Sequence, residues 1–156
     1  MEELMKKKFI IFVLIIFSVQ YLFSEVNMKI YRETREKIIE SKPKIEESYQ
    51  YLHTTSKIGY DYNDIYLGFI LKDSNAEALL KKLFKEAQHN AGKISALIGL
   101  NYLNSSNYNS LKKELKGNVL IYEKCYNLSQ NAQEYMNNYE RQFDRGAFEI
   151  FINQLP

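Results

Sequence analysis

Two stretches decide the fold that the sequence predicts: DIYLGFIL at residues 64–71 and SALIGLNY at residues 95–102. The pattern Leu67-Gly68-x-x-Leu71 in the first stretch recurs 31 residues later as Ile98-Gly99-x-x-Tyr102. Glycine inside a helix costs about 1 kcal/mol relative to alanine. Two glycines at equivalent places therefore indicate helices that pass close to a neighbour there. We expect each stretch to form the first helix of a helix–turn–helix pair.

The rest of the chain, from residue 25 onward, is expected to form further helices within one domain over 25–156. No stretch in it shows strict apolar–polar alternation bounded by turn residues. Breakers at Pro43, Gly59, Ser74, Gly92 and Gly117 separate the segments. The expected helices cover residues 28–40, 43–57, 64–72, 75–89, 93–103, 108–116 and 118–142. The predicted class is all-α, with roughly six to eight antiparallel helices and no sheet of three or more strands.

The repeated pattern resembles that of the tetratricopeptide-repeat family and its Sel1-like relatives over residues 62–117. The positions that carry this resemblance are Leu67, Gly68, Leu71, Phe84 and Ala87 in the first copy, and Ile98, Gly99, Tyr102 and Leu115 in the second. Asp64 and Ser95 depart from it, since the family usually has a large apolar residue there. Leu80 and Leu111 stand where a small residue is usual, and the period is shorter than the family's roughly 34 residues. The resemblance implies an antiparallel helix–turn–helix repeat stack; a non-repeating helical bundle is the alternative.

The resemblance also implies a binding site for a peptide or partner protein, because the first helix of each pair lines a concave groove in that family. Carried over by position, the groove residues are Tyr62, Ile65, Phe69, Lys72, Lys93, Ala96 and Leu100. The Lys and Asn pair with which some members clamp a C-terminal carboxylate is missing. An apolar peptide or amphipathic helix is therefore the expected ligand. Alternatively the long helix or the apolar tail at 148–151 fills the groove, since Phe69 and Leu100 would otherwise need covering.

The expected long helix over 118–142 carries an apolar stripe with 4-3-4-3-4 spacing. The stripe consists of Ile121, Cys125, Leu128, Ala132, Tyr135 and Tyr139. This spacing is near the 3.5-residue period of helices that wrap a partner. We expect the helix to cap the open end of the repeat stack. A homodimer through residues 121–139 is the alternative.

The first 24 residues have the pattern of a signal peptide. Lys6, Lys7 and Lys8 precede an apolar run over 9–23, and the small residue Ser24 suits a cleavage site. The run is shorter than the roughly 20 residues of a membrane-spanning helix, although an uncleaved anchor is the alternative. Both readings export the domain. We expect it in a bacterial periplasm or cell envelope, or secreted, with no membrane contact beyond an uncleaved leader.

The composition favours binding over catalysis. A net charge of +2 does not indicate nucleic-acid binding, and the single cysteine excludes an intramolecular disulfide. We find no catalytic, metal-binding or cofactor-binding motif, and His53 and His89 are 36 residues apart. The chain is therefore expected to be no enzyme and to need no cofactor. A surface adhesin would require an aromatic patch around Tyr60 and Tyr62, and an envelope enzyme would require a polar pocket with carboxylates or His53.

Overall fold

The computed structural model describes residues 25–59, 62–123 and 126–156. The expected signal peptide lies outside these described residues, as do Tyr60 and Cys125. The chain divides into two units, residues 1–37 and 38–156. Residues 25–41 are helical, as the pattern over 28–40 predicts. Within the described residues, no helix has both the length and the apolar character needed to cross a membrane.

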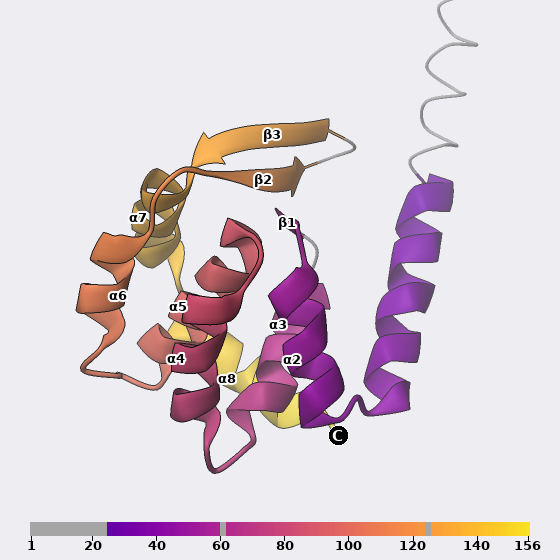
Figure 1. Cartoon of the computed structure of the whole chain (residues 1–156). Helices are drawn as coiled ribbons and strands as arrows, with labels where there is room; N and C mark the ends of the chain where they lie inside the picture. The colour runs from indigo at the N-terminus through magenta and orange to yellow at the C-terminus, as the bar shows by residue number, and fades with distance from the viewer. Residues whose placement is uncertain (1–24, 60–61, 124–125) are drawn as a thin grey trace, which may run out of the picture. The chain divides into compact units, whose positions relative to one another are not determined.

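The second unit is mostly helical and carries a small sheet (Figure 1). Its helices are α2 (Ile45–Thr54), α3 (Tyr62–Leu71), α4 (Ala76–Glu86), α5 (Asn90–Tyr102), α6 (Tyr108–Glu114), α7 (Ala132–Gln142) and α8 (Arg145–Gln154). Its strands are β1 (Lys57–Ile58), β2 (Asn118–Glu123) and β3 (Tyr126–Asn131). The prediction of a predominantly helical chain is therefore confirmed, and helices α3 to α6 form two consecutive helix–turn–helix pairs.

The sheet corrects two expectations. Its order is β1-β2-β3, with β1 parallel to β2 and β2 antiparallel to β3. The prediction that the chain has no three-stranded sheet is wrong, and so is the single helix over 118–142. The run Val119-Leu120-Ile121-Tyr122 is rich in β-branched and aromatic residues, which favours a strand.

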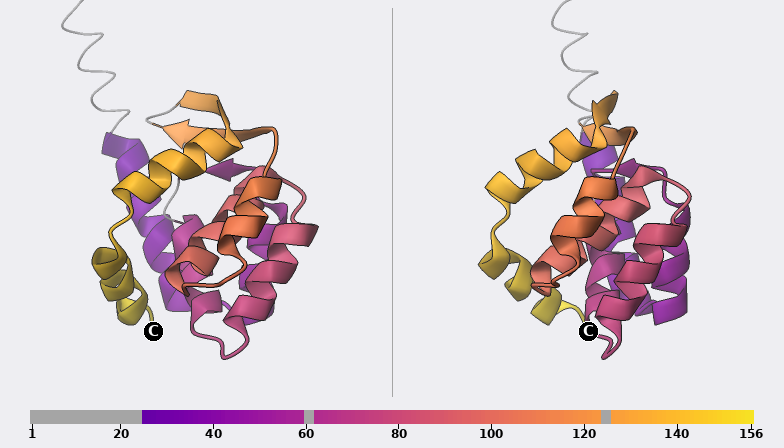
Figure 2. Two further views of the ribbon diagram at one scale, coloured as in Figure 1. Left: turned by 90° about the vertical axis from the view of Figure 1, so that its left-hand side faces the viewer. Right: turned by 60° about the vertical axis from the view of Figure 1, so that its left-hand side comes forward.

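Only the second half of the expected long helix is helical. Helix α7 begins after Asn131, whose side chain accepts hydrogen bonds from the backbone N–H groups of Gln133 and Glu134. The apolar stripe is divided as a result: Ile121 and Leu128 lie in the hairpin, while Tyr135 and Tyr139 lie on α7. In Figure 2, α7 leads from the end of β3 toward α8.

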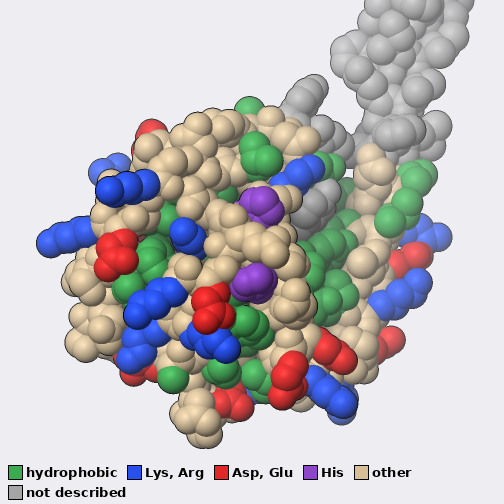
Figure 3. All heavy atoms as spheres, in the orientation of Figure 1, with side chains coloured by type: hydrophobic (Ala, Val, Ile, Leu, Met, Phe, Trp, Pro, Cys, Tyr) green, Lys and Arg blue, Asp and Glu red, His purple; other side chains and the backbone are tan. Residues whose placement is uncertain are grey.

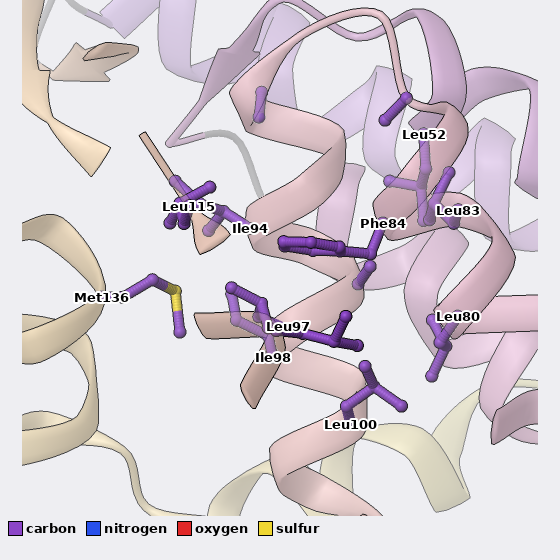
Figure 4. Packing of buried hydrophobic residues seen from close by; sticks show 14 of the residues in the cluster. Leu52, Leu80, Leu83, Phe84, Ile94, Leu97, Ile98, Leu100, Leu115 and Met136 are labelled. Atoms are coloured by element: carbon purple, nitrogen blue, oxygen red, sulfur yellow. The ribbon is translucent and has the colours of Figure 1, made fainter. Parts of the chain in front are cut away.

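The main core forms where α4 and α5 pack together. Figure 4 shows Leu80 and Phe84 of α4 beside Leu97 of α5, with Met136 of α7 reaching in from the other side. A Cβ atom on Gly99 would lie 2.6 Å from Leu80 Cδ1 and 2.9 Å from Leu67 Cδ1. The close approach of helices that the sequence predicts at Gly99 is therefore confirmed. It explains why no larger residue occupies this position.

Candidate functional site

The structure buries the apolar residues of the groove that the repeat resemblance predicts. Ile65, Ala96 and Leu100 are fully buried, and Phe69 is 7% exposed. Ala96 and Leu100 belong to the main core. Tyr62 and Lys93 are half-buried, while Lys72 is exposed at the end of α3. The four apolar side chains therefore offer no open groove to a partner.

The chain's own C-terminal helix covers the α3 part of that groove. Ile65 and Phe69 form a second buried cluster with Leu155, and Tyr62 and Phe151 pack around it. The tail that was expected to be a short apolar segment is thus helix α8, lying on α3. This arrangement agrees with the alternative in which the chain fills the groove itself.

A cavity of about 110 Å³ lies between α3, α5, α7 and the end of β1. Its polar lining comes from Asn63 and Asp64 on α3, Ser95 on α5, and Tyr135 and Tyr139 on α7. Its apolar lining comes from Ile58 and Ile98. Asp64 and Ser95 are the two equivalent positions at which the repeat pattern departs from an expected large apolar residue. The cavity brings both departures together.

Backbone carbonyl groups already engage donors in this lining. Ser95 is 1% exposed, and its hydroxyl donates to the carbonyl oxygen of Ala91 at 3.1 Å. Asn63 is 4% exposed, and its Nδ2 donates to the carbonyl oxygen of Lys57 at 3.1 Å. The hydroxyl oxygen of Ser95 and the amide oxygen of Asn63 keep acceptor capacity. Together with the carboxylate of Asp64, they make the lining rich in acceptors.

The two tyrosines of α7 respond to burial and to the charge of Asp64. Burial, and then the negative charge of Asp64, raise the pKa of Tyr135 to about 12. The same two causes raise the pKa of Tyr139, with further contributions from Tyr135 and Tyr108. Both phenols therefore stay protonated at neutral pH. The shifts also show that the negative field of Asp64 reaches both tyrosines.

A polar cluster between α6 and α7 fixes the helix that carries these tyrosines. Glu140 of α7 accepts hydrogen bonds from the hydroxyl of Tyr108 and from Lys112 Nζ, the latter at 2.6 Å. Burial raises the pKa of Glu140, but the hydrogen bonds from Lys112 and Tyr108 outweigh it, so the pKa lies below its ordinary value. A partly buried, charge-assisted pair of this kind holds α7 in place against α6.

The histidines lie elsewhere, and Figure 3 shows both on one face of the molecule. His53 is half-buried and stacks on Tyr49 at a ring distance of 6.1 Å. The hydroxyl of Tyr49 donates to Glu86 at 2.9 Å. Burial first, and then the hydrogen bond and charge of Glu86, raise the pKa of Tyr49 to about 12. The described part of the chain holds no group of three or more metal-ligating side chains.

Strand β3 forms an outer edge of the sheet. Leu128 lies opposite Ile121 of β2 and Gln130 lies opposite Val119, so all four side chains share one face. Leu128 is nevertheless 49% exposed. Among the described residues, no backbone hydrogen bond outside the hairpin reaches Asn127 or Ser129. The sequence prediction of one helix concealed this edge.

Sequence reasoning noted Asp64 and Ser95 only as departures from a pattern, and it assigned Tyr135 to an apolar stripe. Their common signal was the pair of polar residues 31 positions apart on two otherwise apolar helices. No family model, no characterised protein and no solved structure matches the chain.

Proposed function

We propose that the chain is an exported interaction module rather than an enzyme, and that it binds protein through the free edge of β3. The leader at residues 1–24 supports a place in the periplasm or cell envelope. Two tandem helix pairs, which resemble those of the tetratricopeptide-repeat and Sel1-like family, serve as the scaffold. The observation that carries the proposal is the unpartnered edge of β3 with the exposed Leu128.

The hydrogen-bond pattern of the hairpin determines which groups face outward. Ala132 donates to the carbonyl oxygen of Gly117 at 2.9 Å, which makes residues 117 and 132 a hydrogen-bonded pair. In an antiparallel ladder such pairs alternate with non-hydrogen-bonded ones. Counting along the register makes 119 with 130 and 121 with 128 the next such pairs. The peptide groups of Asn127 and Ser129 therefore point away from β2.

The occupant to which we commit is a second copy of this chain, paired antiparallel about Leu128. In that register Asn127 of each copy lies opposite Ser129 of the other, so their outward peptide groups meet. Leu128 then lies opposite its own symmetry mate on one face of the sheet, where cross-strand side chains contact each other. Residues 127–131 carry no charge, so a two-fold axis brings no like charges together.

The edge also lacks the usual protection against such pairing. Edge strands of monomeric proteins commonly carry lysine, proline or inward-pointing charges, which prevent association. Residues 127–131 contain none of these. The dimer would extend the sheet of each copy across the interface and cover Leu128.

Sedimentation of the purified full chain tests the proposal, with Leu128→Lys as the test variant. We expect concentration-dependent dimers of the unmodified chain, and a dissociation constant at least about tenfold higher for Leu128→Lys because two lysines then face each other. Leu120→Lys is the matched control: Leu120 is 40% exposed, lies on the central strand and points to the opposite face. It should dimerise normally.

Amide hydrogen exchange supplies a second readout. The N–H groups of Asn127 and Ser129 should become protected as the protein concentration rises. An unmodified chain that stays monomeric at millimolar concentration, or two lysine variants that behave alike, would rule out the proposed interface.

A further inference from the structure

We propose that the cavity between α3, α5 and α7 binds a short alkylammonium ion, with its charge at Asp64 and its carbon chain between Ile58 and Ile98. This inference concerns a different surface from the β3 edge and does not depend on dimer formation. It rests on the cavity's size, its acceptor-rich lining and the two equivalent polar positions in the helix pairs.

The size of the cavity selects a small ligand. A protein cavity of about 150 Å³ accommodates benzene. The cavity here measures about 110 Å³. It therefore suits a molecule of about four non-hydrogen atoms, such as propylammonium. A drug-sized or nucleotide-sized ligand would not fit.

The hydrogen-bonding groups select a donor. The hydroxyl of Ser95 already donates to Ala91, and the amide of Asn63 already donates to Lys57, so both residues offer oxygen acceptors to the cavity. The carboxylate of Asp64 offers acceptors as well. A primary ammonium group has three donors and no acceptor, and it complements such a lining.

The charge and the aromatic rings select a cation. Asp64 supplies a negative charge, and Tyr135 and Tyr139 supply ring faces of the kind that attract ammonium groups. A calcium or magnesium ion fits less well, because these ions need six or more oxygen ligands and usually more than one carboxylate. Asp64 is the only carboxylate among the described residues that line the cavity.

The repeat pattern supplies independent support. Helices α3 and α5 are otherwise apolar in this region, with Ile65 and Leu67 on the first and Ala96 and Ile98 on the second. Each helix nevertheless carries one polar residue at the equivalent place, Asp64 and Ser95. A core position needs no such residue for stability, since a buried polar group must first recover the cost of losing water.

Nuclear magnetic resonance of the full chain with ¹³C-labelled tyrosine rings tests the inference. Propylammonium chloride is titrated at constant ionic strength, and the signals are assigned with Tyr135→Phe and Tyr139→Phe. We expect saturable shifts of Tyr135 and Tyr139 with a dissociation constant on the order of 1–10 mM, the range open to so small a ligand. The neutral 1-propanol, which has the same shape, should bind at least about tenfold more weakly.

Two variants locate the charge. Asp64→Asn should weaken propylammonium binding at least about tenfold, because it removes the charge and keeps the shape. Glu134→Gln is the control: it removes one exposed negative charge from α7, outside the cavity, and should leave the binding unchanged. Nα-acetyl-lysine methylamide distinguishes the source of the ammonium group, since it binds only where a partner's lysine side chain can enter.

Equal binding of propylammonium and 1-propanol would overturn the inference, as would unchanged binding by a folded Asp64→Asn variant. If Asp64→Asn does not fold, the comparison of the two ligands on the unmodified chain still decides. Failure of the dimer test leaves these titrations unaffected, so the two proposals can fail separately.

Discussion

Gly68 of α3 faces Leu155 so closely that no Cβ atom would fit between them. The adjacent Lys72 donates hydrogen bonds to the carbonyl oxygens of Leu155 and Pro156. The glycine thus serves packing within the chain: it allows the end of α8 to lie against α3. The same contact covers Phe69, which the repeat resemblance assigns to a ligand groove.

Truncation of Leu155 should destabilise the fold. Leu155 is 4% exposed and packs on Ile65 and Phe69. Leu155→Ala should lower the free energy of unfolding by about 2–4 kcal/mol, as expected for a buried leucine. Urea denaturation measures the change. Ile150→Ala on the same helix is the control, since Ile150 is 61% exposed and should cost less than about 0.5 kcal/mol. Similar losses for both variants would contradict the packing of α8 on α3.

A methyl group added at Gly99 should also be destabilising, because Leu80 and Leu67 would have to move. We expect Gly99→Ala to cost about 1–3 kcal/mol, the usual range for overpacking a core. Thermal denaturation followed by circular dichroism measures this effect. Gly146→Ala is the matched control: its Cβ would lie 3.4 Å from the nearest atom outside its own neighbours. There the better helix propensity of alanine should leave stability unchanged or raise it by up to about 1 kcal/mol. A neutral Gly99→Ala would show that α3, α4 and α5 are less closely packed.

The cluster of Glu140, Tyr108 and Lys112 should make stability depend on acid pH. The pKa of Glu140 in the folded chain lies below its ordinary value of 4.5. The stabilisation is therefore present above pH 4.5 and is lost as the pH falls through the lower, folded pKa. Glu140→Gln should remove this part of the pH dependence and cost about 1–2 kcal/mol at pH 7. Urea denaturation between pH 3 and pH 7, about two pH units on either side of the midpoint of this range, measures both effects.

Glu114→Gln provides the control for this pH series. Glu114 is exposed at the end of α6. Its replacement should leave both the stability at pH 7 and the acid slope close to those of the unmodified chain. Parallel stability curves for the unmodified chain and Glu140→Gln would contradict the role assigned to the cluster.

Local sequence signals predicted most helices, because each buries an apolar face with helical spacing. Helix α4 is an example: Leu80, Leu83 and Phe84 are three and four residues apart and are all buried. Breakers such as Gly92 and Gly117 limited the errors to a few residues at the ends. These helices needed no information about distant parts of the chain.

The hairpin could not be predicted in this way. Ile121 and Leu128 are seven residues apart, a spacing that suits one helix face, and they also pair directly across the hairpin. Strand β2 further pairs with Lys57 and Ile58, which are more than 60 residues earlier in the chain. Such a long-range partner is invisible to periodicity. The cavity depended on the same information, since Tyr135 reaches Asp64 only when α7 is separated from the hairpin.

The position of α8 also determines the order in which the domain can form. Lys72 and Leu155 are 83 residues apart, so their contact closes one of the longest loops in the chain. During synthesis, α3 is complete long before α8, and Ile65 and Phe69 stay uncovered in the meantime. Late, long-range contacts are largely absent from a folding transition state. Helix α8 therefore acts as a latch: its contacts slow unfolding and so prolong the lifetime of the folded chain, while folding itself proceeds at nearly the same rate without them.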